Sequence, residues 1–280
     1  MAEPVVAIVG AAGMLGTDLV AACGKRGIVA RAYDLPAFDI TDAAQLQGAI
    51  EGADAVINCA AYTNVDGAET ETAVAHRVNA EAVGRLGALA RDAGIWVLHF
   101  STDFVFDGGQ DRPYVETDEP NPINEYGRSK LAGEQRLLES GCPCCIVRIE
   151  WTYGLHGKNF VTKVIERARQ GGSLKVVDDQ VGSPTATTEV AATACTLLER
   201  RAEGLFHFAG AGYASRFDVA KFILERCAPQ TDLSACRSSD FITPAQRPLN
   251  SRFDCGKIRP LLALPIRPWQ EALESFLRQL

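Results

Sequence analysis

The sequence lacks a long hydrophobic run and lacks an excess of basic residues. No apolar stretch approaches the ~18 residues that a membrane-spanning helix needs, so we expect no membrane partner. Lysine and arginine number 28 against 35 aspartates and glutamates, which gives a formal net charge of −7. Proteins that bind nucleic acid normally present a basic face, so we expect no nucleic-acid partner.

Secretory and metal-binding signals are also missing. Met1-Ala2-Glu3-Pro4 carries no basic segment, and no small-residue cleavage site follows it, which predicts a cytoplasmic protein. Cys142, Cys144 and Cys145 form the one cysteine cluster, and no second ligand pair at zinc-like spacing stands nearby. We therefore expect no metal, and reduced thiols at all nine cysteines.

The first half of the chain alternates predicted strands and helices. With 280 residues, 47% of them hydrophobic, the chain is expected to be globular, with about two compact units. Short apolar runs predict strands at 5–9, 28–33, 55–59, 95–100 and 144–149, and helical periodicity covers 14–23, 73–93 and 125–139. This α/β alternation predicts a doubly wound parallel sheet over residues 1–150.

The second half is less regular. Helices are expected near 160–170, 187–200, 215–226 and from Trp269, with short strands near 174–177 and 205–208. We expect residues 151–280 to form mostly a smaller lobe over the carboxyl edge of the sheet, with some segments returning to pack on the first domain.

A glycine-rich turn follows the first predicted strand. Gly10, Gly13 and Gly16 have the spacing G-x-x-G-x-x-G, which differs from the G-x-G-x-x-G of the common dinucleotide-binding fingerprint. Glycine permits a tight turn and a close approach of backbone to a pyrophosphate, which the N–H groups at the start of a helix then bind. The spacing favours a dinucleotide site, and a purely structural turn is the alternative.

Asp34 closes the second predicted strand. A carboxylate at this position can accept hydrogen bonds from the adenosine ribose hydroxyls, which favours NADH. Arg31 lies close enough in sequence to accommodate a 2′-phosphate, so NADPH stays open as the cofactor.

Tyr126 and Lys130 stand four residues apart at the start of a predicted helix, on one face. An ammonium group one turn away is expected to stabilise the phenolate and lower the pKa of the tyrosine. Thr102, in Ser101-Thr102-Asp103, follows a predicted strand at the edge where such sheets bind ligands. The alternative is that Tyr126 and Lys130 form a solvated pair.

These motifs resemble the dTDP-4-dehydrorhamnose reductase family, within the extended short-chain dehydrogenases/reductases. The matching pieces are Gly10–Gly16, Asn58–Asp66, Ser101–Phe106, Tyr126–Lys130, Arg148–Gly154, Asp179–Thr185 and Arg247–Ser251. The last two are more specific to this family than the glycine turn is. The resemblance implies a Rossmann-like fold with a C-terminal substrate lobe.

The resemblance also implies an activity: NADH- or NADPH-dependent reduction of the 4-keto group of a dTDP-linked 6-deoxyhexose, most simply dTDP-4-dehydro-L-rhamnose. Tyr126 would be the proton donor, Lys130 its partner and the ribose anchor, and Thr102 would polarise the ketone. Thr102, Asp103 and Trp151 would contact the sugar nucleotide. The cofactor would be lined by Gly10, Gly13, Met14, Leu15, Gly16, Asp34, Asp39, Ile40, Ala60, Ala61, Tyr62, Tyr126 and Lys130.

Two alternatives share the resemblance. The chain could be a related 4-ketohexose reductase of different stereochemistry. It could also be a non-catalytic, NADP(H)-binding regulatory subunit like the β subunit of methionine adenosyltransferase. A homodimer is compatible with the sequence, which does not require one.

Two positions depart from the family pattern. Phe104 stands where tyrosine is usual, which removes a hydroxyl near the site and disfavours a dehydratase, which would use an acid there. Glu150 stands before Trp151, where a small polar residue is usual. A buried charge needs a partner, so we expect Glu150 to pair with Arg148; the alternative is that it changes which sugar is bound.

Overall fold

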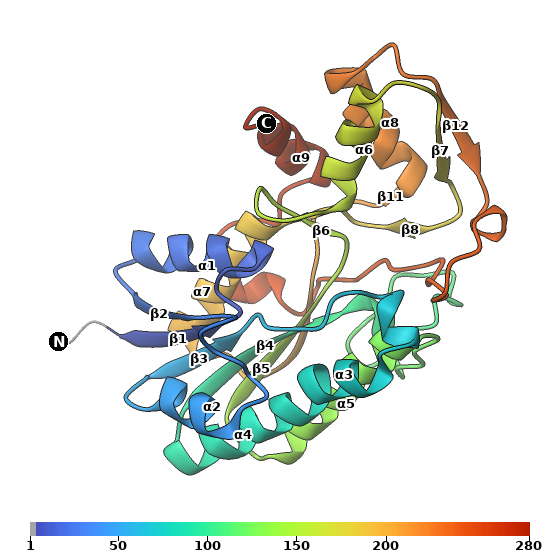
Figure 1. Cartoon of the computed structure of the whole chain (residues 1–280). Coiled ribbons are helices and arrows are strands. Elements are labelled where there is room, and N and C mark those ends of the chain that lie inside the picture. Colours follow the sequence, from blue (N-terminus) through green and yellow to red (C-terminus); the bar gives the residue numbers. More distant parts are fainter. Residues whose placement is uncertain (1–3) are drawn as a thin grey trace.

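The computed structural model describes residues 4–280 and contains a central sheet of six parallel strands (Figure 1). The spatial order is β2-β1-β3-β4-β5-β10. The strands are β1 (Val5–Val9), β2 (Val29–Tyr33), β3 (Ala55–Asn58), β4 (Trp96–Thr102), β5 (Cys144–Ile149) and β10 (Gly204–Phe208). The order reverses between β1 and β3, where doubly wound sheets open a ligand crevice at the carboxyl ends of their strands. The predicted α/β doubly wound sheet is confirmed.

Helices cover both faces of this sheet, each over its own hydrophobic core. One face carries α1 (Met14–Lys25) and α7 (Thr187–Arg200), which pack on each other. The other carries α2 (Ala43–Ile50), α4 (Ala82–Ala93) and α5 (Glu125–Glu139). The helix expected over 73–93 is three pieces, because α3 (Thr72–His76) passes into a π-helical turn, η2 (Arg77–Glu81), before α4.

The second half of the chain builds a separate core beyond the carboxyl edge of the sheet (Figure 1). Its elements are β6 (Thr152–Tyr153), α6 (Phe160–Arg169), β7 (Leu174–Val177), β8 (Val181–Gly182), β9 (Thr185–Ala186), β11 (Ala214–Ser215), α8 (Arg216–Cys227), β12 (Leu233–Cys236) and α9 (Trp269–Leu277). Between them the chain returns to the sheet, since α7 packs on α1 and β10 pairs with β5. Within residues 4–280, no helix is both long and apolar enough to cross a membrane.

A buried ion pair ties the sheet to α5. Arg148, on β5, donates from Nε to Glu134 Oε1 at 2.9 Å and from Nη2 to Oε2 at 2.6 Å. The two side chains are only 2% and 4% exposed. The fork-to-carboxylate geometry satisfies both charges where water cannot reach them. It therefore fixes α5, the helix that carries Tyr126 and Lys130, against β5.

We expect Glu134→Gln to lower the free energy of unfolding by about 3–5 kcal/mol, because it leaves the Arg148 guanidinium buried without a counter-charge. Urea unfolding followed by circular dichroism measures the loss. The matched control is Asp92→Asn, which breaks the exposed pair between Arg91 and Asp92 and should cost about 0–1 kcal/mol. Similar losses in the two variants would contradict a structural role for the buried pair.

Candidate active site

The glycine turn is held by backbone contacts that leave no room for side chains. Gly10 has φ +80°, and a Cβ there would lie 2.5 Å from the backbone nitrogen of Ala60. A Cβ on Gly16 would collide with the Gly10 carbonyl. Gly13 precedes α1 without a side-chain cap, so the N–H groups at the start of the helix are not used by a capping side chain. This cradle at the end of β1 fits a pyrophosphate.

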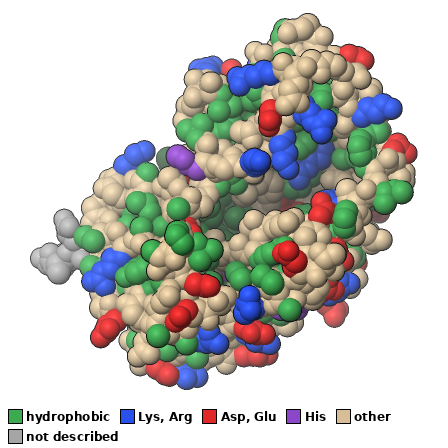
Figure 2. Space-filling model, in the orientation of Figure 1, with side chains coloured by type: hydrophobic (Ala, Val, Ile, Leu, Met, Phe, Trp, Pro, Cys, Tyr) green, Lys and Arg blue, Asp and Glu red, His purple; other side chains and the backbone are tan. Residues whose placement is uncertain are grey.

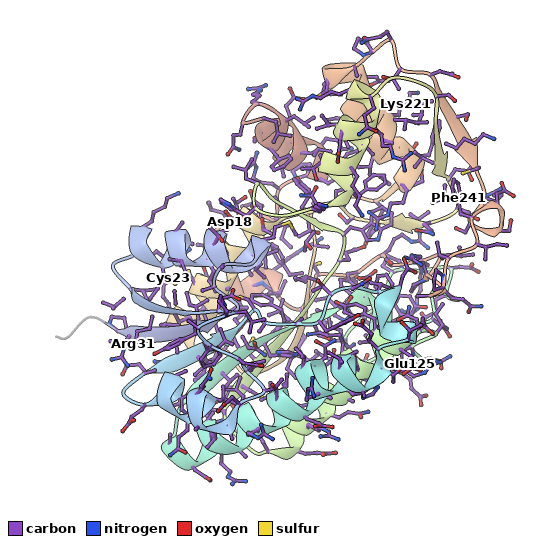
Figure 3. All side chains as sticks on the ribbon, in the orientation of Figure 1. Asp18, Cys23, Arg31, Glu125, Lys221 and Phe241 are labelled. Carbon is purple, nitrogen blue, oxygen red and sulfur yellow. The ribbon has the colours of Figure 1, made fainter. Side chains whose placement is uncertain are left out.

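Asp34 lies beside the glycine turn. Its Oδ2 accepts from the Ala12 N–H at 2.6 Å and its Oδ1 from the Leu35 N–H at 2.7 Å. The carboxylate thus fixes the turn, and the side chain is partly exposed. Arg31 Nη1 donates to the Glu51 carbonyl at 2.8 Å, so its guanidinium is held at the end of α2, by the outer edge of the sheet (Figure 3).

The other candidate cofactor residues divide into two groups. Ala60, Ala61 and Tyr62 follow β3 at the same sheet edge as the turn, and the Tyr62 hydroxyl donates to Glu71 at 2.6 Å. By contrast, the Ile40 side chain belongs to the hydrophobic core under α2.

Three further candidates have structural partners of their own. Asp39 Oδ1 accepts from the backbone N–H and the hydroxyl of Thr41, each at 2.8 Å. Leu15 packs against the core under α1, and Met14 lies beside Asn159 of the second lobe.

Thr102 and Asp103 end β4 in a hydrogen-bonded cluster. The Thr102 hydroxyl donates to Asp103 Oδ1 at 3.0 Å, and the Ser251 hydroxyl donates to Asp103 Oδ2 at 2.5 Å. The Phe104 ring meets the ring of Tyr126 edge to face at 5.5 Å. The structure therefore brings together Thr102 and Tyr126, from segments more than twenty residues apart, and adds Ser251 from the C-terminal part of the chain.

The start of α5 explains why Tyr126 reaches this cluster. Asn124 caps the helix by accepting from the Gly127 N–H at 2.8 Å, and its Nδ2 donates to the Gln246 carbonyl at 2.7 Å. A Cβ on Gly127 would collide with the Phe104 carbonyl, so only glycine lets the first turn of α5 press against the end of β4.

Burial controls the proton of Tyr126. Removal from water, and next the charge of Asp103, raise the pKa of Tyr126 to about 12, while the Thr102 hydroxyl lowers it. The prediction that Lys130 lowers the pKa of Tyr126 is wrong. The Lys130 ammonium instead donates to the Phe100 carbonyl at 2.7 Å, and burial has the largest effect on the tyrosine. A raised pKa keeps the hydroxyl protonated at neutral pH, as a proton donor requires.

A cleft of about 390 Å³ lies against this cluster, lined by residues of both halves of the chain. Phe104, Trp151 and Ser251 line it beside four cationic side chains, and no carboxylate is among its lining residues. The cations are Lys163, Lys175, Arg216 and Arg247. Figure 2 shows lysine and arginine side chains gathered above the hollow between the lobes. In a chain of net charge −7, such a cleft favours an anionic ligand.

Trp151 and Arg216 form one wall of the cleft. Trp151 has φ +46°, and the Arg216 guanidinium lies 3.5 Å from the centre of its ring. Burial lowers the pKa of Arg216 to about 10, which leaves it charged at neutral pH. Sequence reasoning missed Arg216, Lys163 and Lys175, because they stand on separate elements of the second lobe and share no motif.

Glu150 does not pair with Arg148. Arg148 is taken by Glu134, and Glu150 instead accepts from the backbone N–H groups of Ser183, at 2.8 Å, and Phe253, at 3.3 Å. Burial, and next the charge of Asp103, raise the pKa of Glu150 well above its ordinary value. Glu150 therefore joins two segments beneath the cleft.

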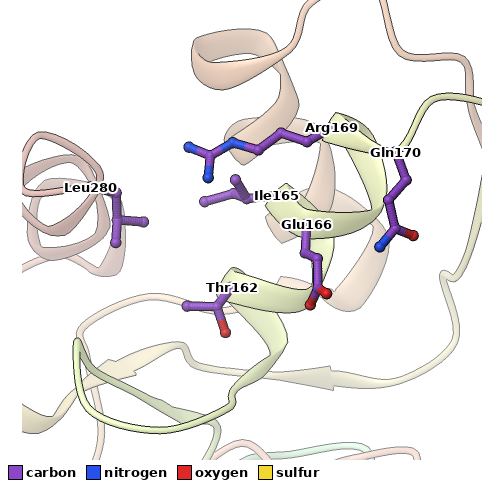
Figure 4. A pocket seen from close by; sticks show the side chains of 6 residues that line it. All are labelled: Thr162, Ile165, Glu166, Arg169, Gln170 and Leu280. Carbon is purple, nitrogen blue, oxygen red and sulfur yellow. The ribbon is translucent and has the colours of Figure 1, made fainter.

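A second cavity, of about 290 Å³, lies between α6 and the C-terminal Leu280 (Figure 4). Thr162, Ile165, Glu166, Arg169, Gln170 and Leu280 line it. None of the residues singled out by the sequence motifs lines this cavity, so the candidate site is the cationic cleft.

Comparisons with known proteins show the family to which the chain belongs. The family model described as RmlD substrate binding domain matches residues 5–280. A dTDP-4-dehydrorhamnose reductase of Mycobacterium tuberculosis is 39% identical over 277 residues, which covers 96% of this chain and 91% of that protein. The chain belongs to the dTDP-4-dehydrorhamnose reductase family.

Two further family comparisons bear on the ligands. The crystal structure of the Bacillus anthracis dTDP-4-dehydrorhamnose reductase in complex with NADP superposes with a TM-score of 0.95, at 32% identity, over 100% of both chains. A dTDP-4-keto-6-deoxy-D-glucose reductase of Streptomyces niveus is 36% identical over 273 residues, covering 95% of this chain and 94% of that protein.

We expect Glu150→Ser to lower the free energy of unfolding by about 1–3 kcal/mol, because the Ser183 and Phe253 N–H groups lose their acceptor. The folded state holds the Glu150 proton more tightly than the unfolded chain does. The parent therefore loses part of this stabilisation as the pH rises above the ordinary glutamate value, and the difference between the proteins should be largest at acidic pH.

Thermal and urea unfolding at several pH values measure this effect, and Glu150→Gln, which keeps an acceptor, should lose less. A change in nucleotide-sugar preference at unchanged stability would instead make Glu150 a specificity residue.

Proposed function

We propose that this chain reduces the 4-keto group of dTDP-4-dehydro-L-rhamnose to give dTDP-L-rhamnose, with NADH or NADPH as reductant. The observation that carries the proposal is the cluster of Tyr126, Thr102 and Asp103, which adjoins the cationic cleft through Phe104 and Ser251. The names of the family relatives, which match along most of their length, support the same substrate.

The cofactor would lie along the carboxyl edge of β1 and β3. When bound, the nicotinamide supplies the hydride for the carbonyl carbon. The glycine turn from Gly10 to Gly16 would bind the pyrophosphate through backbone N–H groups, and Ala60 would lie beside it. Asp34 would accept from the adenosine ribose while fixing the turn. By family resemblance, Met14, Leu15, Asp39, Ile40, Ala61, Tyr62 and Lys130 complete the lining.

The sugar nucleotide would occupy the cleft. Its diphosphate matches the cationic lining formed by Lys163, Lys175 and Arg216, whereas Arg247 is already paired with Asp66. Thr102 would donate a hydrogen bond to the ketone oxygen, and Tyr126 would give that oxygen its proton. Asp103 and Trp151 would contact the sugar.

A division of labour between the two halves fits this arrangement. We propose residues 1–150 as the dinucleotide-binding domain and 151–280 as mostly the substrate domain. The separate core around α6, α8 and α9 supports the second unit, although α7 and β10 pack with the first. A cytoplasmic location and a homodimer stay predictions.

A second candidate is reduction of a 4-keto sugar of other stereochemistry, which the Streptomyces niveus relative favours. The regulatory-subunit alternative is not favoured, because the curated relatives are named as reductases. The deciding experiment supplies dTDP-4-keto-6-deoxyglucose, with and without prior epimerisation to the L-sugar, and follows nicotinamide absorbance with each cofactor. Oxidation of the cofactor only with the unepimerised sugar would favour the second candidate; none with either sugar would remove both.

Asp34→Ala should weaken the binding of NADH more than that of NADPH, because only NADH offers both ribose hydroxyls to this carboxylate. Dissociation constants from fluorescence titration measure the effect. Asp34→Asn is the matched control. It keeps an acceptor for the Ala12 N–H, so it distinguishes the loss of the charge from a disturbance of the glycine turn. Equal losses for the two cofactors would remove Asp34 from the ribose site.

Tyr126→Phe should lower turnover by about 10²–10⁴, the usual contribution of a positioned general acid, while cofactor affinity barely changes. The phenyl ring keeps its packing against Phe104, and only the proton is lost. Steady-state rates and cofactor dissociation constants measure both quantities.

Two variants separate the neighbouring roles. Thr102→Val, which conserves shape, should reduce turnover less, because only a hydrogen bond to the carbonyl is lost. Lys130→Met should weaken cofactor binding as well as turnover. A Tyr126→Phe enzyme that turns over at the parent rate would overturn the mechanism.

A further inference from the structure

Asn58 and His99 form a buried pair directly across the sheet, at the end of β3 and in the middle of β4. Asn58 Oδ1 accepts from the Ala60 N–H at 3.0 Å, which fixes the orientation of the amide. The amide nitrogen Nδ2 therefore faces His99 Nδ1, at 3.0 Å. An amide nitrogen can only donate, so Nδ1 is the acceptor and the neutral ring carries its proton on Nε2.

The protonated side of that ring faces Lys130. His99 Nε2 lies 3.4 Å from Lys130 Nζ, and the lysine side chain is only 3% exposed. An Nε2–H group can donate to the lone pair of a neutral amine, whereas an ammonium would set two donors against each other. His99 does not take up a second proton, because burial holds the pKa of the ring well below its ordinary value.

We propose that His99, oriented by Asn58, is a positioning residue that favours the neutral amine of Lys130. Lys130 then loses its proton more readily than an exposed lysine does. The link to turnover rests on the proposed function, in which Lys130 lines the cofactor site and its loss weakens both cofactor binding and turnover.

The other groups around Lys130 agree with this assignment. The Phe100 carbonyl, on β4, accepts from Nζ at 2.7 Å in either protonation state. Cys59, after β3, is a thiol whose pKa burial raises, and Tyr126 is protonated. Glu134, one turn along α5, favours the ammonium. Burial outweighs it, and the pKa of Lys130 falls to about 8.

A second buried histidine provides an internal contrast. His207 Nδ1 lies 3.1 Å from the Tyr114 carbonyl, which can only accept, so the proton is on Nδ1. Its Nε2 lone pair then faces Arg148 Nη1, at 3.5 Å. This tautomer accepts from a neighbouring cation, whereas the tautomer inferred for His99 sets its N–H against one.

The first experiment is ¹⁵N NMR of the cofactor-free protein labelled at its histidines, of which there are 4. We expect His99 to carry its proton on Nε2 and His207 to carry it on Nδ1, with the signals assigned through His99→Gln and His207→Gln. A proton on Nδ1 of His99 would overturn the proposal, and this measurement on the parent needs no substituted protein to fold.

The second experiment reverses the His99 tautomer. Asn58→Asp keeps an acceptor for the Ala60 N–H and replaces the donor at Nδ1 by an acceptor. His99 Nε2 should then accept from the Lys130 ammonium. Lysine-labelled NMR titration should show the pKa of Lys130 rising by about one unit or more, a tenfold gain in proton affinity.

Asn58→Ser is the matched variant without an added charge, because its hydroxyl can accept from Nδ1–H; it should shift the pKa in the same direction by less. An unchanged Lys130 titration in both variants would overturn the proposal.

Turnover gives an independent reading. Activity of the parent should fall as the pH rises through about 8, because the Lys130 ammonium is lost. In the variants at Asn58 this fall in activity should occur at a higher pH. A chain that shows the expected titration but reduces no 4-keto sugar would remove the proposed function and leave the assignment of His99 standing.

Discussion

The backbone-to-backbone approach at Gly10 is the constraint on which the site depends. A side chain at Gly10 or Gly16 would separate the start of α1 from the ends of β1 and β3. With glycine there, the N-terminus of α1 and the segment after β3 meet at one edge of the sheet, and Asp34 closes the turn from β2. The same edge then receives Thr102 from β4, so the proposed cofactor turn and the proposed catalytic residues share one surface.

Burial sets the proton chemistry at that edge, and it acts in opposite directions on the two central residues. It raises the pKa of Tyr126, because the phenolate loses its water, and lowers that of Lys130, because the ammonium does. Both side chains belong to α5, which the ion pair between Glu134 and Arg148 fixes to β5. The Glu134 and Arg148 charges that are removed from water are thus stabilised by each other, and α5 is held against the sheet.

Local signals account for the elements that were predicted well and for those that were not. The helix over 125–139 was predicted with its observed bounds from its periodicity, and in the structure Asn124 caps it. The helix α2 (Ala43–Ile50) was not predicted, although Asp42 caps it. Its eight residues are mostly alanine and glutamine, with few large apolar side chains, so the hydrophobic periodicity is weak. The π-helical turn η2 was not predicted either, and its Asn79 carbonyl lies against Gly133 of α5, a contact between distant segments.

The sequence by itself determined the alternation of the sheet, the glycine turn and the placement of Tyr126 and Lys130 one turn apart on a helix, because each depends on residues a few positions apart. Only the tertiary structure decided the partner of Glu150, the cationic lining of the cleft and the tautomer of His99. Those features join residues from distant segments, as Ser251 does with Asp103, and a linear pattern carries no record of which buried donor will meet which acceptor. Desolvation selects the partner, and it acts once the chain is folded.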